Sequence, residues 1–241
     1  LEQLESEAQL AGVLGHEVGH VTAKHINDAM VRQTGLAVGV TALVITLGAT
    51  TDLDDDTLGL IGVGAGTGAM VGKIFGVSRA MKGGLGCYAV QVGDLKIGAI
   101  VAVNCLGDVI DPETGERLAG LLNEDLTKVA DTEAIMIQSY AEKHNPFVGN
   151  TTLGIIITNA RLTKSQATKL ASMAHNGYAR SMRPAHSMFD GDTIFTMATG
   201  DIEADVSVLG LLSARVMERA VVSAVKKATP LFGLTCSADL E

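Results

Sequence analysis

The sequence has few basic residues, few cysteines and no apolar run of transmembrane length. It contains 18 Lys and Arg residues against 27 Asp and Glu, which gives a formal net charge of -9, and no basic cluster stands out. Because nucleic-acid binding depends on clustered Lys and Arg that neutralise phosphates, we expect no nucleic-acid partner. The three cysteines are an odd number, and Cys87 and Cys105 lie in apolar, strand-like runs. We therefore expect free thiols and a cytoplasmic protein.

The most apolar uncharged stretch is residues 35–50, GLAVGVTALVITLGAT. It is shorter than the roughly 20 residues that a membrane-spanning helix needs. We interpret it as a buried or interfacial helix, and membrane association through it stays an alternative. With 47% hydrophobic residues, the 241-residue chain has ample material for a packed core.

Local patterns predict a mixture of strands and helices. Alternating apolar residues predict two strands, 88–92 and 95–104, around the turn Gly93-Asp94. The stretch 125–150 is polar and weakly patterned, as expected of an accessible segment. The other expected elements are a strand at 153–158, a helix from the capping box at 163–166 to about residue 180, a strand at 193–198 and a helix at 202–227.

The sequence Asn150-Thr151-Thr152 stands directly before the apolar strand at 153–158. Cleavage of the Asn150-Thr151 bond would give Thr151 a free α-amine, which can act as the base for its own hydroxyl. The hydroxyl would first attack the preceding carbonyl and afterwards attack substrate amides or esters. The alternative is that Thr151 and Thr152 are ordinary strand residues, since β-branched side chains favour strands. Thr152 is a second candidate for the nucleophile.

From about residue 58 to the C-terminus the chain resembles the L-aminopeptidase/D-esterase (DmpA-like) family of self-processing N-terminal-nucleophile hydrolases. The resemblance rests on five ordered blocks: GVGAGTG at 62–68, AMKGGLG at 80–86, GAIVAVN at 98–104, NTT at 150–152 and FDGDTIF at 189–195. It implies an α/β fold, the four-layer αββα sandwich, over residues 58–241 and self-cleavage at 150/151. The family's longer N-terminal half is replaced here by a different segment. A truncated sandwich is therefore an alternative to the complete one.

The resemblance also implies roles for three polar residues. Asn104 matches the asparagine whose amide donates to the oxyanion. Asp190 matches a position where relatives carry a hydroxyl or acidic residue, and Asp192 matches an acidic one. We interpret the two carboxylates as partners of the new α-ammonium and the nucleophile hydroxyl. Alternatives remain, because Asn104 is also compatible with a buried structural amide and Asp-Gly-Asp is a common turn sequence.

The glycine-dense segment 62–76 does not bind nucleotides by a known motif. A phosphate-binding P-loop needs Ser or Thr after its lysine, and Ile74 follows Lys73. We interpret these glycines as permitting tight backbone packing near the active site.

The first residues contain an H-E-x-x-H motif in which His16 and His20 lie four apart on a predicted helix. Such a pair can bind zinc while Glu17 acts as general base, and the segment resembles HtpX-type zinc metalloproteases. A catalytic zinc site needs a third protein ligand. His25 is not at the spacing of known zinc motifs, and the neighbours of Glu203 continue the DmpA-like pattern. We assign residues 1–57 to a helical, metalloprotease-like segment that ends in an acidic linker.

The sequence therefore predicts a cofactor-free aminopeptidase or amidohydrolase that acts on small peptides, amides or esters through Thr151 and forms a homo-oligomer. The first alternative is a zinc endopeptidase that uses His16, Glu17 and His20. The second is an inactive fusion or structural module.

Overall fold

The computed structural model describes residues 68–141 and 150–240. The chain divides into two units, Leu1–Gly68 and Ala69–Glu241, and the fold described below belongs to the second. The domain boundary predicted between residues 57 and 58, the apolar stretch 35–50 and the H-E-x-x-H helix lie outside the described residues and stay predictions. In the described part of the chain, no helix is long and apolar enough to cross a membrane.

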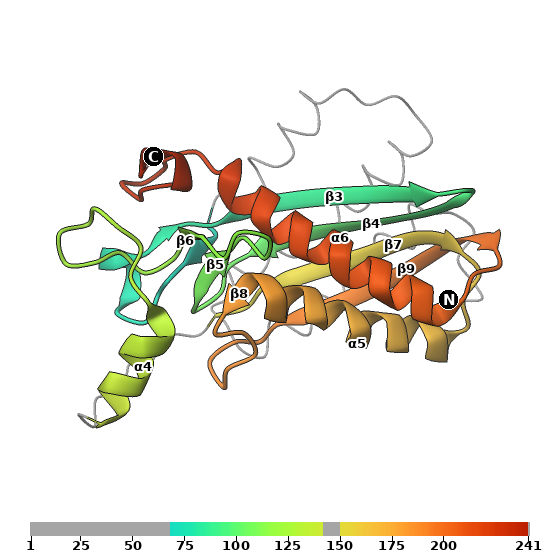
Figure 1. Cartoon of the computed structure of the whole chain (residues 1–241), viewed down its shortest axis with the longest axis horizontal. Helices are drawn as coiled ribbons and strands as arrows, with labels where there is room; N and C mark the ends of the chain where they lie inside the picture. Colours follow the sequence, from blue (N-terminus) through green and yellow to red (C-terminus); the bar gives the residue numbers. More distant parts are fainter. Residues whose placement is uncertain (1–67, 142–149, 241) are drawn as a thin grey trace. The chain divides into compact units, whose positions relative to one another are not determined.

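The main sheet has four strands in the order β3-β4-β7-β9 (Figure 1). These strands are β3 (Gly84–Val92), β4 (Leu95–Val103), β7 (Leu153–Ala160) and β9 (Thr193–Ile202). β3 and β4 are antiparallel and join through a two-residue turn, which confirms the predicted hairpin. Gly93 in this turn has a φ of 60°, a conformation that glycine adopts without steric cost. β7 pairs antiparallel with β4 and parallel with β9.

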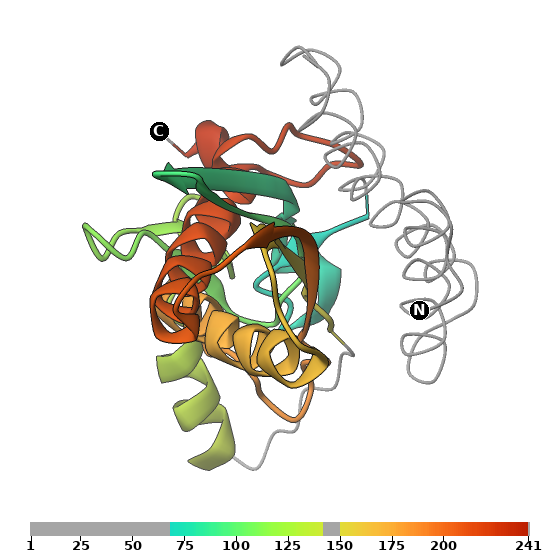
Figure 2. The same cartoon turned by 90° about the vertical axis from the view of Figure 1, so that its right-hand side faces the viewer.

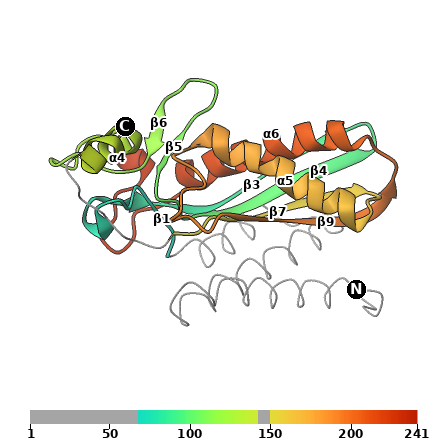
Figure 3. The same ribbon diagram turned by 90° about the horizontal axis from the view of Figure 1, so that it is seen from below.

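Two long helices, α5 (Lys164–Ser181) and α6 (Val206–Lys226), pack against each other and cover one face of this sheet (Figures 2 and 3). α5 begins at the predicted capping box, because the Thr163 hydroxyl accepts a hydrogen bond from the backbone amide of Gln166. α6 begins four residues later than predicted. β9 continues to Ile202, and the Asp205 carboxylate then caps the helix by accepting from the amides of residues 207 and 208.

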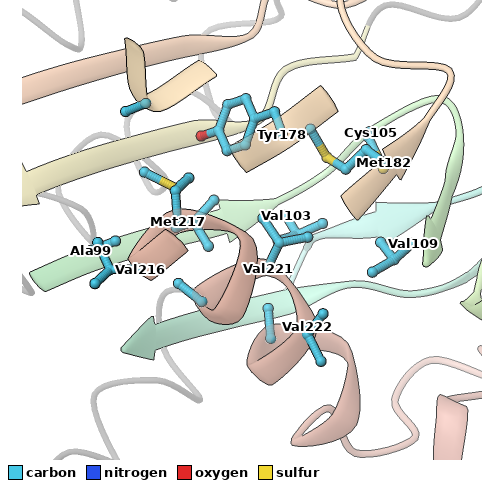
Figure 4. Packing of buried hydrophobic residues seen from close by; sticks show 14 of the residues in the cluster. Ala99, Val103, Cys105, Val109, Tyr178, Met182, Val216, Met217, Val221 and Val222 are labelled. Carbon is cyan, nitrogen blue, oxygen red and sulfur yellow. The ribbon is translucent and has the colours of Figure 1, made fainter. Parts of the chain in front are cut away.

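The core lies between the two helices and the sheet (Figure 4). Met217 and Val221 of α6 are fully buried, as are Val103 of β4 and Tyr178 of α5. The α/β class predicted from the sequence is confirmed. Of the four layers expected of an αββα sandwich, the described residues form a helical layer on one face of a four-stranded sheet, together with two smaller sheets.

Close packing of α6 on β3 depends on Gly86. A methyl group at Gly86 would lie 1.9 Å from the Ala220 carbonyl oxygen and 2.6 Å from the Ala224 amide nitrogen, both backbone atoms of α6. We expect Gly86→Ala to lower the free energy of unfolding by about 1–3 kcal/mol, because helix and strand must separate. Denaturant unfolding measures this change. Equal stability of Gly86→Ala and the unmodified protein would contradict this packing.

The smaller elements lie at one end of the main sheet. They are β1 (Met70–Val71) with β2 (Met81–Lys82), the 3-10 helices η1 (Gly76–Arg79) and η2 (Ser237–Asp239), the sheet of β6 (Arg117–Ala119), β5 (Asp108–Ile110) and β8 (Met182–Arg183), and α4 (Thr132–Ala141). α4 lies within the stretch 125–150, for which the sequence patterns predicted no helix or strand. The buried Asp108 carboxylate fixes the start of α4 by accepting from both the amide and the hydroxyl of Thr132.

Candidate active site

The sheet topology brings the predicted site residues to one edge. β7 and β9 are parallel, so the residues that precede them lie at the same end of the sheet. β4 is antiparallel to β7, so its last residues lie at this end too. Thr151, Asn104 and the Asp190 to Asp192 turn therefore converge, although they come from three distant parts of the sequence.

The Asn150-Thr151 peptide is hydrogen-bonded to the turn that precedes β9. The Asn150 amide donates to the Phe189 carbonyl at 2.9 Å, and the Gly191 amide donates to the Asn150 carbonyl at 2.8 Å. The same carbonyl oxygen accepts from the Thr151 hydroxyl at 2.6 Å. The hydroxyl thus lies against the carbonyl group that it would attack, and that carbonyl already has a backbone N–H donor.

Thr152 occupies a different environment from Thr151. Its side chain is fully buried, and its hydroxyl accepts a hydrogen bond from the backbone amide of Asn104 at 3.3 Å. Thr151 is only partly buried, and a Cβ on Gly191 would lie 2.9 Å from its hydroxyl oxygen. Glycine at 191 therefore leaves room beside the Thr151 hydroxyl. This arrangement supports the choice of Thr151 over Thr152.

The Asn104 side chain has a defined orientation. Its Oδ1 accepts from the Lys73 ammonium at 2.7 Å and from the Met70 amide at 3.1 Å. Its Nδ2 is thereby turned to the Thr151 carbonyl, at 3.4 Å. In the uncut chain, the Asn104 side chain thus faces the carbonyl of Thr151, while the Gly191 amide donates to the carbonyl of Asn150.

Lys73 is a site residue that the sequence interpretation missed. Its side chain is buried, and Nζ donates to both Oδ1 and the backbone carbonyl of Asn104. Burial lowers the pKa of Lys73 from 10.5 to about 8, although nearby Cys105, Asp190 and Asp192 oppose this decrease. The apolar residues on both sides of Lys73 were the available signal, since they indicate a buried lysine.

The two aspartates hold backbone groups around the site. Asp190 accepts from the Leu106 amide at 3.0 Å and from the Ser187 hydroxyl at 2.6 Å, and burial raises its pKa. Asp192 accepts from the Thr152 amide at 3.1 Å. Among the described residues, neither carboxylate is hydrogen-bonded to the Thr151 hydroxyl. Their predicted contacts with the hydroxyl and the new ammonium stay predictions for the cut protein.

A metal site was predicted only in the first residues. His16, Glu17 and His20 lie outside the described residues. Within 68–141 and 150–240, no group of three or more His, Cys, Asp or Glu side chains is arranged to hold a metal ion.

Comparison with known families identifies the main body of the chain. The model of peptidase family S58 matches residues 49–237. The chain belongs to peptidase family S58. The match covers all the described site residues and confirms the similarity inferred from the five sequence blocks. The model of peptidase family M48 matches residues 1–85, where the H-E-x-x-H motif lies.

Similar proteins include two aminopeptidases described as uncharacterized. The chain is 37% identical to one from Mycobacterium leprae over 153 residues, which cover 62% of this chain and 40% of the relative. It is 31% identical to one from Mycobacterium tuberculosis over 208 residues, which cover 77% and 57%. The chain thus spans about half the length of these relatives. A solved structure, the β-aminopeptidase of a Burkholderia species, has 19% identity and a TM-score of 0.46, and covers 73% of this chain and 50% of its own.

Proposed function

We propose that this S58 peptidase cleaves its own Asn150-Thr151 bond and then hydrolyses amides or esters at the N-terminus of small peptides, with Thr151 as nucleophile. One observation carries the proposal. The Thr151 hydroxyl and the Gly191 amide both hydrogen-bond the carbonyl oxygen of the bond to be cut. The names of the mycobacterial relatives, both aminopeptidases, support the class of reaction.

In the first cut, the acyl group of Asn150 moves from the nitrogen to the hydroxyl oxygen of Thr151. The hydroxyl oxygen attacks the Asn150 carbonyl carbon and forms a five-membered ring, in which the carbonyl oxygen becomes an oxyanion held by the Gly191 amide. Rupture of the carbon–nitrogen bond leaves an ester between Asn150 and the Thr151 side chain. The hydroxyl proton is transferred by way of a base to the departing amine. Water then hydrolyses the ester, which releases the Asn150 carboxylate and restores the Thr151 hydroxyl.

The first cut needs a base other than the Thr151 amine, because that amine does not yet exist. Lys73 suits this role. With a pKa of about 8, about one tenth of its side chains are neutral at pH 7. A neutral amine has two N–H groups, which match the two acceptors on Asn104, and one lone pair that remains to take the hydroxyl proton.

After the cut, Thr151 carries its own base. A free α-amine has a pKa of about 7.7–8, so a useful fraction is neutral near pH 7. Asn104 then supplies an amide N–H for the oxyanion of the substrate, and Asp190 and Asp192 lie in the turn beside the new N-terminus. The reaction requires no cofactor. Small peptide, amide or ester substrates, a homo-oligomeric assembly and a cytoplasmic location complete the proposal.

The intact mass of the purified full chain under denaturing conditions tests the proposal. We expect two fragments, residues 1–150 and residues 151–241, the second beginning with Thr151. A single chain that stays uncut and carries one equivalent of zinc would contradict the proposal. That result would favour a zinc peptidase built on His16, Glu17 and His20, the alternative that the family M48 match supports.

A further inference from the structure

His186 approaches the site from the loop between β8 and β9 and contacts one of the predicted carboxylates. Its backbone amide donates to Asp192 Oδ2 at 3.2 Å, and its ring Nδ1 lies 3.0 Å from the same oxygen. The other oxygen, Oδ1, accepts from the Thr152 amide. The Asp192 side chain is almost fully buried, at 1% exposed, whereas the His186 side chain is 38% exposed. His186 thus covers the solvent side of a carboxylate that anchors the chain next to Thr151.

The His186 ring also interacts with α5 on its other side. It makes a hydrogen bond with the backbone of His175, and the rings of the two histidines lie 4.8 Å apart. Contacts of the ring with a carboxylate and with a backbone carbonyl favour the imidazolium, which carries a proton on each nitrogen. The hydrogen bond to Asp192 is the largest cause that raises the pKa of His186. Burial and the charge of His186 lower the pKa of His175, so the two rings favour different protonation states.

Other titratable groups near this ring pair lie on the same loop and on α5. Asp190 acts on His186 through its charge, and the Tyr178 ring centroid is 6.1 Å from that of His186. The negative charges of Asp190 and Asp192 therefore face the imidazolium.

The backbone of His186 is adapted to this contact. Its φ is 57°, in the left-handed region that residues other than glycine rarely adopt. In this conformation both the amide and the ring reach the same oxygen of Asp192. The amide hydrogen bond and the ring ion pair together fix that carboxylate more firmly than either contact does by itself.

We propose that His186 is a positioning residue that holds the Asp192 carboxylate against the Thr152 amide and so fixes Thr151 for attack. Thr151 is then restrained on both sides: through Asn150 by the backbone of residues 189 and 191, and through Thr152 by the His186-Asp192 pair. The catalytic consequence rests on the proposed function, whereas the coupling of His186 to Thr152 does not.

The coupling is measured by NMR in the full chain carrying Thr151→Ala, which stays uncut. We expect the His186 ring to titrate with a midpoint above 6.5, and the Thr152 amide signal to move with the same midpoint. The movement should be absent when His186→Asn is added, because asparagine does not titrate in this range. A Thr152 amide that does not respond to the His186 titration would overturn the proposal, whether or not the protein is a peptidase.

The effect on the reaction is measured as the rate of cleavage at 150/151 in a matched pair of variants. Glycine and asparagine both tolerate a φ of 57°, so neither variant adds backbone strain. Asparagine places its Nδ2 where the imidazole has Nδ1, and glycine places nothing there. We expect His186→Gly to cut about 10- to 100-fold more slowly than the unmodified chain, because a loosely held reactive group loses its alignment.

We expect His186→Asn to cut at least about tenfold faster than His186→Gly, since it restores a donor to Asp192. Cleavage by His186→Gly at the unmodified rate would overturn the positioning role. If the unmodified chain is itself never cut, the proposed function fails, and the NMR titration alone decides whether His186 is coupled to Thr152. Thermal melting of both variants shows whether a slow rate reflects unfolding.

Discussion

We expect replacement of Thr151 by alanine to leave the chain in one piece and to remove hydrolysis of peptide amides. In the proposed mechanism the hydroxyl is the attacking group in both the first cut and the later turnover, so no step should proceed without it. The loss should be at least about 10⁴-fold, as expected when a nucleophile is deleted. Intact mass shows the uncut chain, and release of an amine from a small peptide amide measures turnover.

Serine at position 151 is the conservative control, because it keeps a hydroxyl at the same point of the side chain. Thr151→Ser should still cut after Asn150. Thr152→Val tests the neighbouring threonine. The Thr152 hydroxyl is buried and accepts from the backbone amide of Asn104. The variant should therefore cut at the same bond, though more slowly. Turnover by Thr151→Ala would rule out Thr151 as nucleophile. The same conclusion would follow if Thr152→Val stayed whole while Thr151→Ala was cut.

The elements that the sequence predicted well depend on local interactions. The hairpin around Gly93 and the capping box at Thr163 are defined by residues close together in the chain. The start of α6 was predicted too early, because pairing of Ile202 with Ala160 of β7 extends β9 beyond its apolar core. α4 was missed since its first turn is fixed by Asp108, which lies 24 residues before Thr132 in the sequence.

The site shows the same division. Asn150, Thr151 and the aspartates were predicted as site residues because their short motifs resemble a known family, and the sheet places them together. Lys73 and His186 belong to no such motif. Lys73 is a site residue only because it meets Asn104 across 31 positions, and His186 only because the loop before β9 folds back onto Asp192. Contacts of this kind depend on the tertiary fold and have no local pattern.

Replacement of Lys73 by methionine should slow the first cut by about 10²- to 10⁴-fold, the usual contribution of a general base. Methionine has a similar length and no basic nitrogen. In the unmodified chain the rate should rise as pH increases through about 8, because the neutral amine is the active form. Lys73→Met should lose this rise. Cleavage rates by intact mass, from pH 6 to pH 10 for both proteins, provide the comparison.

Stability distinguishes this role from a structural one. The pKa of Lys73 is about 8 in the folded chain and 10.5 when exposed, so below pH 8 the buried charge costs about 3 kcal/mol of folding free energy. Between these values the unfolded chain binds more protons, and the contribution of Lys73 to stability therefore improves as pH rises from about 8 to 10.5. Lys73→Met removes this cost and also the two hydrogen bonds to Asn104, so the two effects oppose each other. The variant should be about as stable as the unmodified chain at pH 7, although it should cut far more slowly. A variant that is destabilised at pH 7 but cuts with an unchanged pH profile would show that Lys73 supports Asn104 and is not the base.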